Sequence, residues 1–235
     1  DGATPLIIAS QKGHKEVYEL LLEKGARTDA VDEYGKTLLY VASQNGHVEM
    51  CKLLIDKGAN IDVVDEYEKT PLMRAVENGQ KEVCKFLIDK GASINAATKY
   101  GRTPLMRASE NGYKGVCELL LDKGAEVNTA TKNRLTPLWL AIQRGHAEVC
   151  ELLLDRGASI HVEGKNLLQI ASQKGLKRIC LLILNKELNT PDSKPASFIY
   201  SAIHSLPDDE SYDMLQPLLI LFASKDLLNT KNTSC

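Results

Sequence analysis

The segment Thr70-Pro71-Leu72-Met73-Arg74-Ala75 decides the fold, together with Gly79 and the residues that follow. Thr suits the N-cap of a helix because its hydroxyl accepts from a free backbone N–H, and Pro suits the first helical position. Gly79 should end this short helix, because glycine readily adopts positive φ. A second helix is expected over 81–90. Its apolar stripe is too wide for one partner, so we expect neighbours to cover it on two sides.

The same pattern recurs along the chain with a period of 33 residues. Its threonine stands at Thr4, Thr37, Thr70, Thr103 and Thr136. A sixth copy is three residues shorter and has Asn166 at the threonine place. Two glycines keep the same register in the first five copies, and Ala follows the second one; the sixth copy keeps the first glycine, Gly175, but has Glu187 at the second place. Since one helix pair cannot bury its own apolar faces, the copies are expected to stack as a solenoid.

Thr-Pro-Leu-x-x-Ala, then Gly, then Val/Cys-x-Leu-Leu-Leu and Gly-Ala-x-x-Asn resemble the ankyrin repeat family over residues 1–188. The resemblance implies an all-α solenoid of antiparallel helix pairs, each with a projecting hairpin finger. The copies are expected at about 1–31, 32–64, 65–97, 98–130, 131–160 and 161–188. Residues 189–235 lose the pattern, and we predict a degenerate helical pair that caps the stack, followed by a frayed end. An unrelated helical extension is the alternative.

Two fingers depart from the family pattern at the turn. Glu68 and Arg134 stand where other fingers have Gly35 and Gly101, so these two fingers are expected to differ in shape. The family usually has His directly after Thr-Pro-Leu, whereas this chain has mostly large apolar residues there. Those places hold Ile7, Tyr40, Met73, Met106, Trp139 and Gln169.

Composition narrows the function classes. The 235 residues include 29 Lys and Arg against 31 Asp and Glu, a formal net charge of -2. This balance disfavours a nucleic-acid binder, which needs a positive surface. The longest apolar runs fall well short of the ~20 residues that span a membrane. No secretory leader is visible, so we expect an intracellular protein, cytoplasmic or nuclear.

Five cysteines share one place on the second helices. They are Cys51, Cys84, Cys117, Cys150 and Cys180. Neighbours should lie about one interhelix distance apart, ~8–10 Å, whereas a disulfide needs Cα atoms within ~7 Å. Zinc needs converging sulfurs, usually at short spacings that are missing here. We therefore expect small buried hydrophobes in a reducing compartment, with no metal and no cofactor.

His14, His47 and His146 also share one register, which keeps them from converging, and hydrogen bonding at the helix start is expected for them. No nucleophile, phosphate-loop or metalloprotease motif occurs, and the acidic pairs Asp32-Glu33 and Asp65-Glu66 fall on finger tips. Such tips should be solvated, without the burial that tunes a carboxylate for catalysis. The chain is therefore not expected to be an enzyme.

In the ankyrin family the finger tips and the exposed end of the first helix form a concave binding face. Carried over by register, the expected contact residues are Glu33, Tyr34, Lys36, Glu66, Tyr67, Lys69, Arg74, Glu77, Lys99, Tyr100, Arg102, Arg107, Glu110, Lys132, Trp139 and Arg144. Tyr34, Tyr67 and Tyr100 form a ladder of a residue type common at interfaces. The finger charge changes from acidic to basic along the stack. The alternative for the tyrosine ladder is repeat duplication with packing within the stack, and the alternative for the charges is an ordinary solvated surface. Trp139 could equally fill the core.

These observations favour a non-catalytic, monomeric module that binds a protein or peptide partner on this face. The alternative is a regulatory or targeting segment of a larger enzyme, channel or ubiquitin-ligase adaptor, suggested by the start at Asp1 inside a finger. A third hypothesis follows from the resemblance: Asn95 and Asn128 occupy a place that an oxygen-dependent hydroxylase modifies in this family. Nucleic-acid binding is supported only by the basic stretch of copies four and five.

Overall fold

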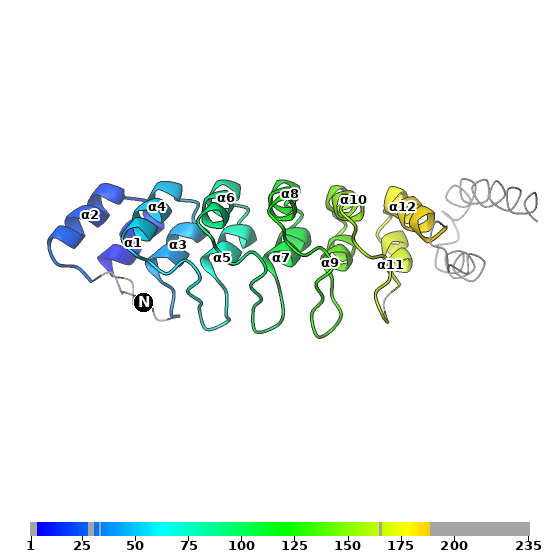
Figure 1. Cartoon of the computed structure of the whole chain (residues 1–235), viewed down its shortest axis with the longest axis horizontal. Helices are drawn as coiled ribbons and strands as arrows, with labels where there is room; N and C mark the ends of the chain where they lie inside the picture. The colour runs from blue at the N-terminus through cyan, green and yellow to red at the C-terminus, as the bar shows by residue number, and fades with distance from the viewer. Residues whose placement is uncertain (1–3, 28–30, 33, 165, 189–235) are drawn as a thin grey trace, which may run out of the picture.

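The computed structural model describes residues 4–27, 31–32, 34–164 and 166–188. In these residues twelve helices form six antiparallel pairs that lie side by side along one axis (Figure 1). The first helices of the pairs are α1 Pro5–Lys12, α3 Leu38–Gln44, α5 Pro71–Glu77, α7 Pro104–Asn111, α9 Pro137–Arg144 and α11 Leu167–Gln173. The second helices are α2 Lys15–Glu23, α4 Val48–Asp56, α6 Lys81–Asp89, α8 Lys114–Asp122, α10 Ala147–Asp155 and α12 Lys177–Leu188.

Each first helix packs on its own second helix and on the first helices of the neighbouring pairs. The loops between pairs project on one side of the stack (Figure 1). An antiparallel bridge joins Val31 to Thr37 at the base of one such finger. This arrangement confirms the predicted all-α solenoid. The cap predicted over 189–235 lies outside the described residues.

The first helices begin and end as predicted from the repeated Thr and Gly. The Thr70 hydroxyl accepts from the N–H of Met73 at 3.2 Å, and the other repeat threonines cap in the same way. In the shortened copy, the side chain of Asn166 accepts from Gln169. Gly112 ends α7 with a φ of 75°, in the left-handed region. Local capping chemistry therefore sets where each first helix starts and stops.

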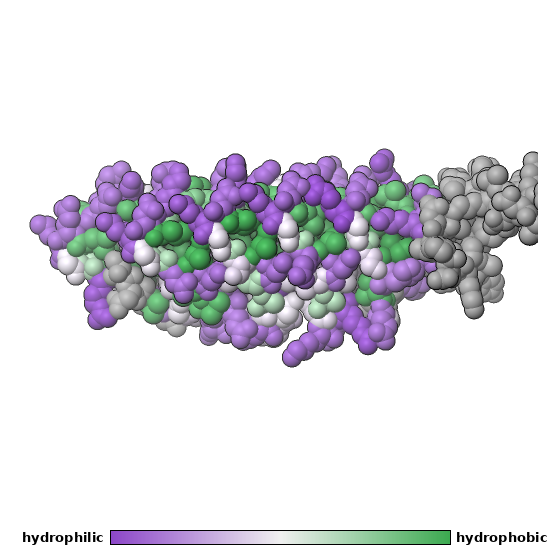
Figure 2. All heavy atoms as spheres, viewed as in Figure 1, coloured by the Kyte–Doolittle hydropathy of each residue, from purple (hydrophilic) through white to green (hydrophobic). Residues whose placement is uncertain are grey.

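The second helices inside the stack, α4, α6, α8 and α10, each have a second helix on both sides, as their wide apolar stripe predicted. The in-register cysteines are all free and at most 1% exposed. Burial raises the pKa of their thiols to about 11 at Cys51 and Cys180 and to about 12 at Cys84, Cys117 and Cys150. These thiols are protonated at neutral pH and serve as packing groups. Figure 2 shows an apolar band along the stack, bordered by hydrophilic residues.

The fingers share one turn, including those without glycine. Asp65 Oδ1 accepts from the N–H groups of Tyr67 and Lys69, both at 2.9 Å, and Asp32 bonds the equivalent N–H groups. Glu68 has a φ of 58°, against 72° at Gly35. The expectation that the fingers of Glu68 and Arg134 differ in shape is wrong at the turn: Arg134 also has a positive φ, 59°. The side-chain and backbone bonds of the turn hold both residues in a conformation that costs about 1–2 kcal/mol for non-glycine residues.

Candidate partner-binding surface

Three tyrosines project from the tips of successive fingers, as the sequence predicted. Tyr34 is 52% exposed, Tyr67 40% and Tyr100 63%. The backbone N–H of each tyrosine donates to the side chain of the residue two places before it, and this bond fixes the turn from which the ring projects. We call Tyr34, Tyr67 and Tyr100, with Lys99 and Lys132, the tyrosine face. Lys99 and Lys132 are exposed, and Glu33 lies outside the described residues.

A lysine joins two of the rings. Lys99 Nζ lies 4.3 Å from the ring centre of Tyr67 and 5.2 Å from that of Tyr100. The backbone N–H of Lys99 also donates to the carbonyl of Tyr67. On the second finger Lys36 lies 4.7 Å over Tyr34. Cations over aromatic faces hold the rings in place, and each such contact contributes about 0.5–1 kcal/mol when exposed.

Asp65 does not lie on the solvated tip where the sequence placed it. Its side chain is 2% exposed and accepts from the Tyr40 hydroxyl at 2.8 Å and from Arg74 Nη2 at 3.2 Å. Burial alone would raise the pKa of Asp65. Two backbone N–H groups, the Tyr40 hydroxyl and Arg74 outweigh burial and hold that pKa below its usual value. The acidic charge of this finger is thus partly neutralised inside the fold.

The remaining inner charges pair with one another along the first helices. Glu77 contacts Lys69 at 3.1 Å, Arg74 at 2.7 Å and Arg107 at 3.3 Å. Glu110, in the same register one pair further, contacts Arg102, Arg107 and Arg144 at 3.1–3.4 Å. We call the set the ionic row; its members are Lys69, Arg74, Glu77, Arg102, Arg107, Glu110 and Arg144.

The surroundings of Glu110 in the ionic row favour its charged state, whereas burial lowers the pKa of Arg102. Burial opposes ionisation of Glu110, but the hydrogen bond from Arg144 and the charges of Arg102 and Arg107 outweigh it and lower the pKa of Glu110. Most side chains of the row are only 13–25% exposed, whereas Arg144 is 59% exposed. Residues predicted as open contacts are therefore largely paired with one another, and two of these ion pairs, Arg107–Glu77 and Arg144–Glu110, join neighbouring helix pairs.

Trp139 lies in the hydrophobic core and is 9% exposed. The sequence left its role open between groove and core, and the structure places it in the core. Its neighbours on α9, Leu138 and Leu140, are each 1% exposed. Trp139 therefore adds little to the exposed surface beside Lys132 and Arg144.

His47, Gln80 and His146, which stand at the start of second helices, contact the preceding pair, and the sequence did not reveal this. His47 Nε2 donates to the carbonyl of Gln11 at 2.9 Å, and His146 Nε2 donates to that of Glu110 at 3.0 Å. Neither imidazole caps its own helix, contrary to the expected bonding at the helix start. The sequence holds one sign of this contact, because His, Gln or Tyr follows the first glycine in five of the six copies. The bonding partner, however, lies 36 residues away in the chain.

The asparagines of the Gly-Ala-x-x-Asn segments also bridge neighbouring pairs. Asn95 Oδ1 accepts from the N–H of Glu126 at 3.1 Å, and Asn128 Oδ1 accepts from that of Ser159 at 2.8 Å. Both residues are exposed at the surface. The bonds give each asparagine a structural role, and hydroxylation of Asn95 or Asn128 stays a prediction.

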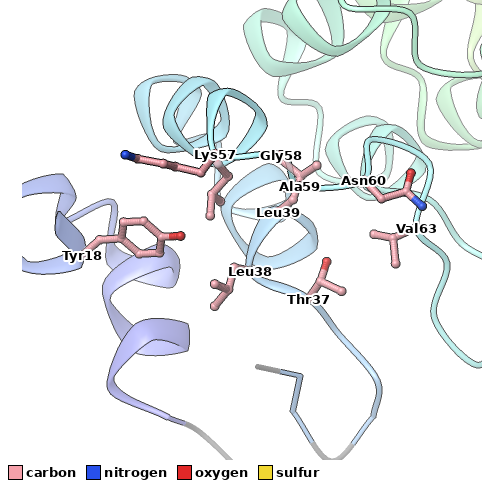
Figure 3. Close-up of a pocket in the computed structure, with 10 residues that line it drawn as sticks. Tyr18, Thr37, Leu38, Leu39, Lys57, Gly58, Ala59, Asn60 and Val63 are labelled. Carbon is pink, nitrogen blue, oxygen red and sulfur yellow. The ribbon is translucent and has the colours of Figure 1, made fainter. Parts of the chain in front are cut away.

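A hollow of about 280 Å³ lies between the first and second pairs (Figure 3). Leu38, Leu39 and Ala59 line it, with the Tyr18 ring at one side and Lys57 above. Among the described residues that line it, the ionisable side chains are Tyr18 and Lys57, and burial raises the pKa of Tyr18. Within the described ranges, no three His, Cys, Asp or Glu side chains gather as a metal site. The helices found there are all too short or too polar to cross a bilayer.

The repeated helix pairs, their capping threonines and their fingers agree with one family. The family model for ankyrin repeats, which spans three copies, matches residues 1–65, 58–131 and 126–192. The chain belongs to the ankyrin repeat family. Ankyrin repeats generally act as protein–protein interaction modules and are typically non-catalytic. No curated protein matches the sequence.

Proposed function

We propose that this ankyrin repeat chain binds a protein or peptide partner through its tyrosine face and has no catalytic role. The observation that carries the proposal is the row of Tyr34, Tyr67 and Tyr100, each at least 40% exposed, on three consecutive fingers. Exposed aromatic rings of this kind, held by neighbouring cations, offer a large contact area at a low entropy cost.

Charge should orient the partner along the fingers. The ionic row holds five cations against the carboxylates Glu77 and Glu110, and Asp65 pairs with one of those cations, so the row stays net positive. Further accessible charges lie nearer the finger tips. Glu66 and Glu68 are exposed on the third finger, and Lys99 and Lys132 on the fourth and fifth. A partner with basic residues toward the second and third fingers and acidic residues toward the fifth fits this order. Such complementarity speeds association and fixes orientation more than it adds affinity.

The test removes the two rings that flank Lys99. Tyr67→Ala with Tyr100→Ala should abolish at least one interaction that the wild-type chain makes, scored by quantitative co-purification and mass spectrometry. Lys85→Ala, at an exposed place on α6 away from the fingers, is the matched control and should keep every partner. Thermal melting monitors folding, and the double variant should melt within a few degrees of wild type because both rings are exposed.

An unchanged partner set in the well-folded double variant would remove the tyrosine face as the binding site. A charge reversal, Lys99→Glu, gives a second readout: it should slow association with a confirmed partner, more strongly at low salt. The alternative role, regulation or targeting within a larger enzyme, channel or ubiquitin-ligase adaptor, would use the same face and differs in what the rest of the polypeptide does.

A further inference from the structure

The first helix pair leaves a set of apolar side chains in solvent at one end of the stack. Ile8 on α1 is 47% exposed, and on α2 Val17 is 47% and Leu20 54% exposed. His14, at the start of α2, lies beside them in the sequence and is also exposed. We call Ile8, His14, Val17 and Leu20 the outer face. No described helix lies beyond α1 and α2 at this end (Figure 1).

The register places of Val17 and Leu20 are covered in every later pair. The residues equivalent to Val17 are between 0% and 3% exposed, and they are Met50, Val83, Val116, Val149 and Ile179. The residues equivalent to Leu20, such as Leu53 and Phe86, are partly buried against the core. Each later pair therefore buries this side against the pair before it, so the outer face has the composition of an interface between repeats.

His14 adds a polar feature to the same face. Its equivalents His47 and His146 each donate from Nε2 to a carbonyl in the last turn of the preceding first helix. His47 also lies over Gly13, and a methyl group built there would be 2.7 Å from Nδ1. In the described part of the chain His14 makes no such bond. The outer face thus presents both the apolar side chains and the donor that a preceding pair would receive.

A terminal repeat that served as a cap would show a more polar outer side. We propose that the outer face is a docking surface for one further helix pair of the ankyrin type, seated in the register of the existing stack. The geometry of the existing interfaces defines the features that this added pair needs. It has a glycine where its first helix ends, an open carbonyl in the preceding turn, and an apolar side toward Val17 and Leu20. The inference is independent of the tyrosine face.

The test supplies such a pair from this chain. A copy of residues 67–99 joined before Asp1 of the full chain keeps the period of 33 residues. Hydrogen exchange of the amides in α1 and α2 should slow by about tenfold or more, because half-exposed apolar side chains become buried. The control carries Val17→Lys with Leu20→Lys. These changes should alter the unextended chain little, and should abolish the added protection in the extended one.

Three results would overturn the proposal. The added copy could fold without slowing hydrogen exchange in α1 and α2. It could also stay unfolded, which would mean that the outer face does not bind it, because an internal copy folds only when it packs on a neighbour. The lysine pair could leave the added protection unchanged. A different occupant would show in sedimentation of the unextended chain: a reversible dimer lost in the lysine variant would assign the outer face to a second copy instead.

Discussion

Arg107 Nε lies 3.3 Å from Glu77 Oε1, and this ion pair joins the third helix pair to the fourth. Glu77 also accepts from Lys69 and Arg74 of its own repeat. One carboxylate thus serves three cations from two repeats. In a solenoid the contacts between neighbours dominate stability, so a residue that binds both sides of one interface matters more than its partial exposure suggests.

Replacing Glu77 should weaken the centre of the stack. Glu77→Gln removes the negative charge and leaves three cations close together, at an expected cost of about 1–2 kcal/mol in the free energy of unfolding. Urea unfolding followed by circular dichroism measures the change. Glu118→Gln on α8 is the control, because Glu118 makes no ion pair in the described part of the chain, and it should shift the midpoint little. Equal effects of the two substitutions would refute the role given to Glu77.

Acid should destabilise the stack through Asp65 and Glu110. Both pKa values are lowered in the fold, so the unfolded chain takes up protons at a higher pH than the folded one. The stabilisation is complete above the unfolded pKa values, near 4, and is lost as the pH falls through the folded ones. Urea midpoints measured between pH 6 and 3 should decline, and Glu110→Gln should decline less steeply. An identical slope in the variant would contradict this account.

The turn of the third finger stores strain that a single substitution can relieve. Glu68 holds a φ of 58°, and no hydrogen bond or ion pair of its side chain is seen among the described residues. Glu68→Gly should raise the free energy of unfolding by up to about 1 kcal/mol, because glycine adopts this conformation without a steric penalty. Gly35→Ala makes the converse change at the equivalent turn, where the added methyl group meets nothing within 4 Å. It should lower stability by a similar amount. Destabilisation by Glu68→Gly would show that the turn is unstrained.

The sequence was sufficient to predict the helix pairs, because their limits depend on local chemistry. Thr70 caps the third N–H of its own helix, and Gly112 ends a helix through its own φ. The burial of Asp65 could not be predicted from the sequence, because it depends on contacts with Tyr40 and Arg74, which come from two different repeats. The tyrosine ladder was visible as a pattern of residues, whereas the placement of Lys99 between two rings required the spacing of adjacent fingers. Contacts between repeats depend on rotamers and on how closely helices approach, and neither is written in the 33-residue period.

The close approach of His146 to Gly112 can be separated from the conformation of that glycine by a matched pair of variants. Gly112 and Gly145 hold the same place in adjacent repeats, with φ values of 75° and 80°. A methyl group on Gly112 would lie 2.5 Å from Nδ1 of His146, whereas one on Gly145 would meet nothing within 4 Å. Both Gly→Ala changes carry the cost of the left-handed conformation, about 1–2 kcal/mol.

Only Gly112→Ala should also displace the imidazole and break its bond to the carbonyl of Glu110, for about 1–2 kcal/mol more. Urea unfolding of the two variants measures this difference directly. His146→Ala in the Gly112→Ala background should remove most of the extra cost, because the methyl group then has room. Equal destabilisation by Gly112→Ala and Gly145→Ala would mean that the imidazole moves aside freely and does not couple the fourth pair to the fifth.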